Sequence, residues 1–215
     1  MNEREFLGLV RSLPVFTSRQ VASLVGGPGY AKVYLHRLMT RGVVRRLGRG
    51  FYTIHDDPVV YATHVHYPSY ISLWQAFQHY GVTTQLPAVI EVMASRSGVL
   101  DGVEFIRSRH LWGYTSVRYG DFCIFMADLE KAVLDALSTG RVPPDVIAGA
   151  IGKCNPGKLE NYVLRMDIGT QKKLGYIAEA GGLALEKLHR KICLDRNYVR
   201  LAGARTPNRW RVKSD

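Results

Sequence analysis

The sequence predicts an α+β fold, with a small N-terminal module followed by an α+β domain. Apolar residues recur at helical spacing through the first forty positions, and the period then changes to that of strands. Beyond residue 81, strand-like runs come first and helical runs follow, which is not the order of an alternating parallel sheet. We therefore expect one domain over residues 1–57 and a second over residues 58–215.

Three helices are expected before residue 42, because apolar residues three or four positions apart share one face of a helix. The expected ranges are Glu3–Leu13, Arg19–Val25 and Tyr30–Arg41. The side chains expected to face the core are Phe6, Leu9, Val10 and Leu13 in the first helix, Val21 and Leu24 in the second, and Ala31, Leu35 and Leu38 in the third.

Capping and turn residues mark the ends of these helices. Pro14 ends the first helix, Thr17 or Ser18 supplies an N-cap for the second, and Gly42 stands where a left-handed cap closes the third. The segment 26–29, Gly-Gly-Pro-Gly, is expected to be a turn with no helical option.

A two-stranded hairpin is expected directly after the third helix. Val43–Leu47 and Phe51–Ile54 alternate as strands do, around the turn Gly48-Arg49-Gly50. Three helices followed by a hairpin is the order of a winged helix-turn-helix, in which a recognition helix enters the major groove of DNA.

Positive charge is concentrated at the two ends of the chain, whose formal net charge is +11. Residues 1–56 contain nine Lys/Arg against three Asp/Glu, residues 187–215 contain nine against two, and residues 57–186 contain eleven against thirteen. Such ends indicate an anion-binding surface, and duplex phosphates are the commonest partner. A solvated basic surface with no partner is the alternative.

Nine residues of the third helix and the hairpin are the candidate DNA contacts. Lysine and arginine there can donate to guanine or neutralise phosphates, and cations at a hairpin tip gain from the negative potential of the minor groove. The alternatives are an ordinary polar helix face and a strand edge protected by positive charge. The candidates are Tyr30, Lys32, Tyr34, His36, Arg37, Arg41, Arg45, Arg46 and Arg49.

The second domain is expected to open with a helix, Tyr70–Tyr80, capped by Ser69. The expected strands are Ala88–Ala94, Val103–Arg107, Tyr114–Arg118 and Phe122–Met126. The expected helices are Asp128–Leu137, Asp145–Ile151, Lys158–Arg165, Thr170–Ala180 and Leu183–Ile192. Lys131 is expected to pair with Glu130 or Asp135 on the exposed side of its helix. The tail is expected to form a strand around Arg209–Val212 or to be partly disordered.

Two patterns resemble catalytic or metal-binding motifs. The segment 152–158, GKCNPGK, has the spacing of a phosphate-binding loop, but Leu159 replaces the required Ser or Thr and Pro156 removes a backbone donor. His64 and His66, with the acidic residues at positions 56 and 57, lack a third metal ligand at diagnostic spacing. We therefore expect no cofactor and no metal.

A third pattern concerns nuclease chemistry. Glu91 lies in a predicted strand where a metal-dependent nuclease would need an acidic residue followed by a lysine, and the lysine is missing. No nucleophile motif of a hydrolase is present either. We expect no catalytic residues and no enzyme. A metal-dependent enzyme acting on nucleic acid is the less favoured alternative.

Cysteine usage and the N-terminus indicate a cytoplasmic protein without a membrane partner. The cysteines at positions 123, 154 and 193 have no metal-binding spacing, so we expect buried free thiols. No apolar run approaches the roughly 20 residues of a membrane helix, and acidic residues at positions 3 and 5 do not fit a signal peptide.

The ordered set of segments resembles a known family. The segments are RLMTRGVVRRLGRGFYTI, PSYISLWQAFQHYG, MADLEKAVLDAL, KKLGYIAEAGG and NRWRV. Across residues 5–212 they resemble the AbiEi-type antitoxins, the repressor-antitoxin halves of toxin–antitoxin operons. The resemblance implies a winged helix that binds inverted repeats in the chain's own promoter. It also implies a C-terminal domain that counters a nucleotidyltransferase-like toxin encoded beside it.

We therefore predict a DNA-binding transcriptional repressor and antitoxin. Its expected partners are double-stranded DNA, on which it would bind as a homodimer, and a cognate toxin. The second domain would serve dimerisation, partner recognition or both. A solitary winged-helix regulator with no toxin partner is the alternative.

Overall fold

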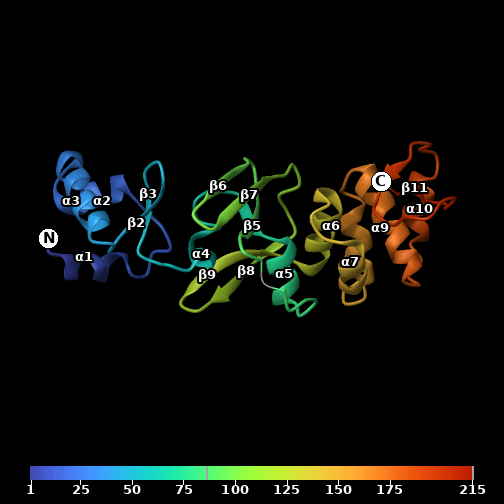
Figure 1. Ribbon diagram of the computed structural model, residues 1–215, viewed down its shortest axis with the longest axis horizontal. Coiled ribbons are helices and arrows are strands. Elements are labelled where there is room, and N and C mark those ends of the chain that lie inside the picture. Colours follow the sequence, from blue (N-terminus) through green and yellow to red (C-terminus); the bar gives the residue numbers. More distant parts are fainter. Residues whose placement is uncertain (86, 215) are drawn as a thin grey trace. The chain divides into compact units, whose positions relative to one another are not determined.

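The computed structural model describes residues 1–85 and 87–214 (Figure 1). The chain divides into two compact units. Unit 1 comprises Met1–Ile71, Ala88–Leu111 and Ser116–Phe125, and unit 2 comprises Ser72–Pro87, Trp112–Thr115 and Met126–Asp215. Helices and strands are both present, so the predicted α+β class is confirmed. The domain boundary expected at residue 57 stays a prediction.

Unit 1 begins with three helices and a small sheet. In chain order these elements are α1 (Glu3–Val10), β1 (Phe16–Thr17), α2 (Ser18–Val25), α3 (Pro28–Thr40), β2 (Arg45–Gly48) and β3 (Phe51–Thr53). Strand β3 pairs antiparallel with both β1 and β2, in the order β1-β3-β2. Helices α2 and α3 pack side by side (Figure 1). This is the predicted winged helix-turn-helix, and the hairpin β2–β3 is its wing.

Local sequence sets the start of each of the first two helices. Asn2 and Glu5 form a capping box at α1, and Thr17 and Gln20 form one at α2, so backbone N–H groups at both helix starts are satisfied. Gly42 follows α3 with a φ of +70°, which confirms the expected left-handed position.

Three details of this module differ from expectation. The segment 26–29 is not wholly a turn, because α3 begins at Pro28, whose fixed φ and missing N–H suit the first helical position. Leu9 and Leu24 were expected in the core but are 53% and 43% exposed. Helix α1 ends at Val10, so Phe6 and Val10 supply its buried face.

A six-stranded sheet, most of it in unit 1, has the order β6-β7-β5-β4-β9-β8. Its strands are β4 (Ser69–Ile71), β5 (Ile90–Ala94), β6 (Gly98–Leu100), β7 (Val103–Arg107), β8 (Tyr114–Tyr119) and β9 (Phe122–Ala127). Strands β5 and β7 are parallel, whereas β4–β5 and β6–β7 are antiparallel. A short helix, α4 (Pro58–Tyr61), precedes the sheet.

The helix expected over residues 70–80 begins later. Tyr70 and Ile71 belong to β4, where they pair with Met93 and Val92 of β5, and the helix α5 (Leu73–His79) starts only after Ser72. Aromatic and β-branched residues favour a strand wherever a partner strand is available, which their local spacing does not reveal.

Unit 2 contains the predicted run of five helices. They are α6 (Leu129–Thr139), α7 (Pro144–Ile151), α8 (Pro156–Val163), α9 (Ile168–Ala180) and α10 (Glu186–Ile192). Helix α6 packs against α5, α7, α8 and α9, so it is buried on nearly all sides.

This burial corrects the expectation for Lys131. Its ion pair with Asp135 lies in the interior, where the two side chains are 0% and 1% exposed, and not on an exposed face. Ser72 Oγ donates to Asp135 Oδ2 at 2.9 Å, and the Lys131 ammonium lies 5.1 Å from the centroid of the Trp112 ring. Burial lowers the pKa of Lys131, and the Asp135 carboxylate opposes that shift.

The C-terminal tail contributes a short strand pair and a buried tryptophan to unit 2. Strands β10 (Val199–Arg200) and β11 (Val212–Lys213) pair in parallel, so the tail's strand lies slightly later than expected. Trp210 is 1% exposed and lies against Gly175 of α9, where a Cβ atom would overlap the indole ring. Its Nε1 donates to Glu179. The tail is thereby packed into unit 2.

Candidate nucleic-acid interface

Helix α3 separates its buried residues from its polar ones. Ala31, Tyr34, Leu35 and Leu38 are buried, and the intervening positions are exposed. The exposed predicted contacts on this helix are Tyr30, Lys32, His36 and Arg37. The apolar stripe therefore packs α3 onto α1 and α2 and directs these four side chains outward.

A hollow of about 820 Å³ lies between α2, α3 and the wing. Its floor includes Leu35, Met39 and Tyr52. Its basic residues come from three elements, and no carboxylate is among the described residues that line it. These basic residues are Arg19 of α2, Lys32 and His36 of α3, Arg46 of β2, and Arg49 of the wing turn.

The wing tip is irregular in a way that exposes its arginines. The pairing register of β2 and β3 shifts between Arg46 and Gly48, which marks a bulge. Arg46 Nε donates to the carbonyl oxygen of Gly48 at 3.1 Å, so the bulge orients this guanidinium. Arg49 occupies the turn that follows.

Two predicted contacts, Arg45 and Arg41, have acidic partners within unit 1. Arg45 forms ion pairs with Asp56 at 3.2 Å and Asp101 at 2.5 Å. Arg41 forms one with Glu3 of α1 at 2.5 Å. These arginines connect α3 and the wing to neighbouring segments, and neither lines the hollow.

Tyr34 lies in the core and not on the surface. It is 8% exposed, its ring packs edge-on against Phe6 at 5.5 Å, and its hydroxyl donates to the carbonyl oxygen of Asn2 at 3.3 Å. Burial raises the pKa of this hydroxyl, and Glu3 adds to the shift. Tyr34 also stacks under the half-exposed ring of Tyr30, at 6.1 Å between centroids, and so supports it.

Arg19 is the residue that the sequence-based site lacks. It stands at the second position of α2 and lines the same hollow as Lys32 and Arg49. Its only signal in the sequence is a cation in the first turn after the Thr17 cap. This signal does not identify Arg19 as part of the site, because the sequence does not show that α2 and the wing line the same hollow.

The residues considered for catalysis or metal binding have other partners. His64 Nε2 lies 2.9 Å from the carbonyl oxygen of Cys123, and His66 packs edge-on against Phe105 at 4.7 Å. Burial lowers the pKa of His66, as does nearby Arg96. Over residues 1–85 and 87–214, no group of three or more His, Cys, Asp or Glu side chains could hold a metal ion.

The other two candidate patterns are placed as follows. Lys158 lies in α8, which begins at Pro156, and its ammonium pairs with Asp128 at 3.0 Å and Glu130 at 3.2 Å. Glu91 is buried in β5, in register with Glu104 of β7.

The three cysteines are free, and only one of them is buried. Cys154 is buried, which raises the pKa of its thiol to about 12. Cys123 and Cys193 are exposed, so the expectation of three buried thiols is wrong for these two. Cys123 lies within β9, and Cys193 is the C-cap residue of α10.

None of the helices in the described part of the chain has the length and apolar character needed to cross a lipid bilayer.

Together the three helices, the wing and the basic hollow define the N-terminal part of unit 1 as a winged helix-turn-helix module. Residues 9–55, from within α1 to just past the wing, match the model of a family described as transcriptional regulator, AbiEi antitoxin. The predicted resemblance to AbiEi antitoxins is thereby confirmed for this segment.

The fold of nearly the whole chain has a counterpart among solved structures. It is similar to the crystal structure of the RV2827C protein from Mycobacterium tuberculosis, with a TM-score of 0.62. The likeness covers 97% of this chain and 89% of that one, at 13% sequence identity, and so concerns the fold alone. A comparison with curated proteins found no match.

Proposed function

We propose that the chain is a DNA-binding transcriptional repressor whose α3 and wing contact duplex DNA. The observation that carries this proposal is the hollow in which Arg19, Lys32, His36, Arg46 and Arg49 converge from three elements without a carboxylate among them. Cations on a recognition helix and wing are placed as duplex binding requires, because phosphates flank both grooves.

The two sides of this surface would have different roles. Arg46 and Arg49 of the wing, together with Arg19, would neutralise phosphates and fix the protein on the duplex. Lys32, His36 and Arg37 of α3 would reach base edges, where lysine and arginine donate to guanine. Tyr30, half exposed at the start of α3, would contact the same groove. Arg41 and Arg45 would act indirectly, through their ion pairs within unit 1.

The binding mode follows from the geometry of such modules. Inverted repeats in the promoter of this reading frame would present two equivalent half-sites, and a homodimer would place one α3 in each. Binding there would block transcription of the chain's own operon.

The test replaces the two wing arginines. We expect Arg46→Gln with Arg49→Gln to weaken binding to a labelled duplex from the region upstream of this reading frame. We also expect the slope of log affinity against log salt to fall by about two, since each lost phosphate contact removes about one. Fluorescence anisotropy over a salt series measures both quantities.

The matched control removes the same charge elsewhere on unit 1. Arg11→Gln with Arg118→Gln replaces two exposed arginines that do not line the hollow. This control should keep the wild-type slope. The hollow is not the DNA-binding surface if the wing variant also keeps the wild-type salt slope. The same conclusion follows if the control variant loses as much DNA affinity as the wing variant does.

The family match over residues 9–55 supports a second role, that of an antitoxin. Its partner would be a nucleotidyltransferase-like toxin encoded beside this chain, countered by residues 58–215. Co-expression of the full-length chain with the neighbouring reading frame should restore growth, and the Arg46→Gln, Arg49→Gln variant should restore it equally. Loss of rescue by wild type would remove the antitoxin role without affecting the repressor role.

A further inference from the structure

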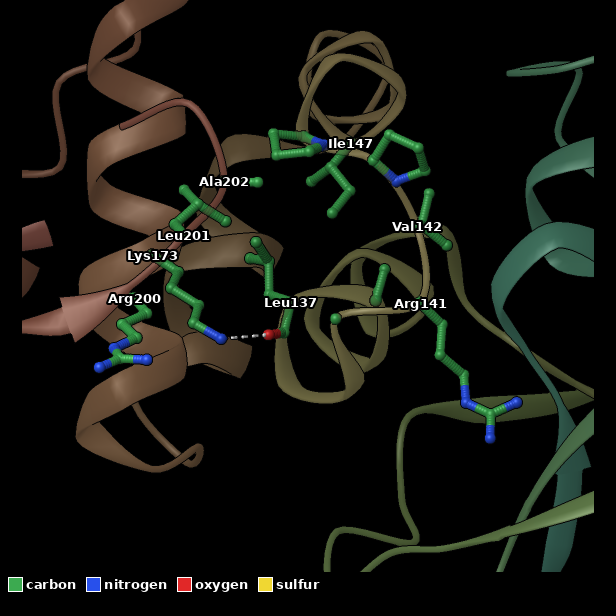
Figure 2. Close-up of a pocket in the computed structure, with 12 residues that line it drawn as sticks. Leu137, Arg141, Val142, Ile147, Lys173, Arg200, Leu201 and Ala202 are labelled. Atoms are coloured by element: carbon green, nitrogen blue, oxygen red, sulfur yellow. Dashed lines mark hydrogen bonds between the residues drawn. The ribbon is translucent and has the colours of Figure 1, made fainter. Parts of the chain in front are cut away.

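A second hollow, of about 490 Å³, lies within unit 2. It is formed by the end of α6, the start of α7, one residue of α9 and the segment at and after β10 (Figure 2). The first and last of the residues that line it, Ala136 and Ala202, are more than 60 positions apart, so the sequence alone gives no sign of the hollow. Its volume is in the range of pockets that hold small organic molecules.

The floor of this hollow is apolar. Eight of the twelve described residues that line it are alanine, valine, leucine, isoleucine or proline. Figure 2 shows Leu137, Ile147, Leu201 and Ala202 converging on the space, with Val142 beside them. Contact with such a floor favours an apolar body, because it removes that body from water.

The charged residues that line the hollow are all cations. Arg141, Lys173 and Arg200 are the three, and no carboxylate is among the described lining residues. Lys173 Nζ donates to the carbonyl oxygen of Leu137 at 3.1 Å, which holds the ammonium at the floor (Figure 2). An ammonium has three N–H donors, so two remain for a ligand. Arg200 lies on the Lys173 side, and Arg141 lies across the hollow.

We propose that this hollow binds a small amphipathic carboxylate, with its apolar body on the floor and its carboxylate beside Lys173 and Arg200. The apolar floor would contribute nothing to binding a phosphate or a nucleic-acid backbone. The cations would contribute nothing to binding a neutral apolar molecule. Only a ligand with both features uses the whole lining, and this holds whether or not unit 1 binds DNA.

Two probes of equal chain length separate these contributions. We expect octanoate, added to the full-length protein below its micelle concentration, to shift the methyl NMR signals of Ile147 and Leu201 saturably. Octan-1-ol should bind the same place about fivefold more weakly, as expected for the loss of a partly exposed ion pair. Inorganic phosphate should leave both signals unchanged.

The results that overturn the proposal are equally specific. Equal affinity for octanoate and octan-1-ol would show that the cations do not recognise the ligand. Octanoate shifts at Ile147 no larger than those at Val99, a residue of unit 1 that is 81% exposed, would show that the hollow does not bind it. Displacement of octanoate by phosphate at equal concentration would indicate a phosphate site instead.

Variants locate the two halves of the site. Arg200→Gln should weaken octanoate binding and leave octan-1-ol binding unchanged. Arg196→Gln removes an exposed arginine four positions earlier in the chain that does not line the hollow, and it should change the binding of neither probe. Ala202→Trp fills the hollow from an exposed position and should abolish both. Equal effects of the two arginine variants, or wild-type binding by Ala202→Trp, would refute the assignment.

Discussion

The two basic regions of the chain have similar charge but different surroundings. Residues 1–56 have nine cations against three acids, and residues 187–215 have nine against two. In the first region, the side chains of Arg19, Lys32, His36 and Arg49 make no hydrogen bond or ion pair with any residue that the structure describes. They are therefore available to an anionic partner.

In the C-terminal region, several cations are occupied by the fold itself. Arg209 pairs with Glu179 at 2.8 Å and with Glu186 at 3.0 Å. Arg211 donates to the carbonyl oxygen of Asp195 at 2.8 Å, and Lys191 donates to that of Leu164 at 3.1 Å. These cations hold the tail and α10 to the rest of unit 2.

Net charge along a sequence therefore does not distinguish a binding surface from a structural network. The acceptors that engage these cations lie between 16 and 30 positions away along the chain, and only the fold brings them close. They are Leu164 just after α8, Glu179 of α9, Glu186 of α10 and Asp195 after α10. In the wing, by contrast, strand pairing and a bulge place Arg46 and Arg49 at a hollow with no carboxylate among its described lining residues.

The largest effect that we expect is on stability, and it concerns Trp210, which holds the C-terminal tail to unit 2. We expect Trp210→Ala to lower the free energy of unfolding by about 3–5 kcal/mol, because it removes a buried indole packed on Gly175. Urea denaturation measures it. Tyr198→Ala, at a side chain that is 52% exposed, is the control and should change stability by less than about 0.5 kcal/mol. Equal effects would mean that the tail is not a packed part of unit 2.

A smaller effect compares one arginine from each region. Arg209→Gln should lower the urea midpoint of unfolding, because Glu179 and Glu186 lose their shared partner. Arg49→Gln should leave the midpoint unchanged and weaken DNA binding, because its side chain has no acceptor within the described residues. The comparison fails if Arg209→Gln changes DNA binding as much as Arg49→Gln does, with no change in the midpoint.

Much of the fold could be predicted from sequence because its signals are local. The three N-terminal helices, the wing, β7 and the five later helices follow from apolar spacing, caps and glycine turns. Strand β4 could not be predicted in this way, since it depends on pairing with residues of β5 that lie 21 to 25 positions further along the chain. The burial of Lys131 also escaped prediction, because four helices must surround α6 before its polar face is covered.

The basic character of the candidate site could be predicted from the sequence, but the residues that form it could not all be predicted. A basic third helix and a basic hairpin identify the surface, yet the sequence does not show which cations are already paired. Arg41 and Arg45 meet Glu3, Asp56 and Asp101, and two of these three acids are 38 or more positions away. Tyr34 turned inward because helix position, and not residue type, decides burial on α3.

The smallest effect concerns two adjacent arginines of β2. Arg45 forms an ion pair with Asp101, and the Arg45 side chain is 36% exposed. A double-mutant cycle on Arg45 and Asp101 should therefore give a coupling free energy of about 0.5 kcal/mol for the stability of the fold. Arg45→Met should leave the salt slope of DNA binding unchanged, whereas Arg46→Gln should reduce it by about one. A slope that falls equally in both variants would mean that Arg45 leaves its acidic partners to neutralise a phosphate. The wing would then bind DNA with both faces of β2, and the distinction between paired and available cations would not hold there.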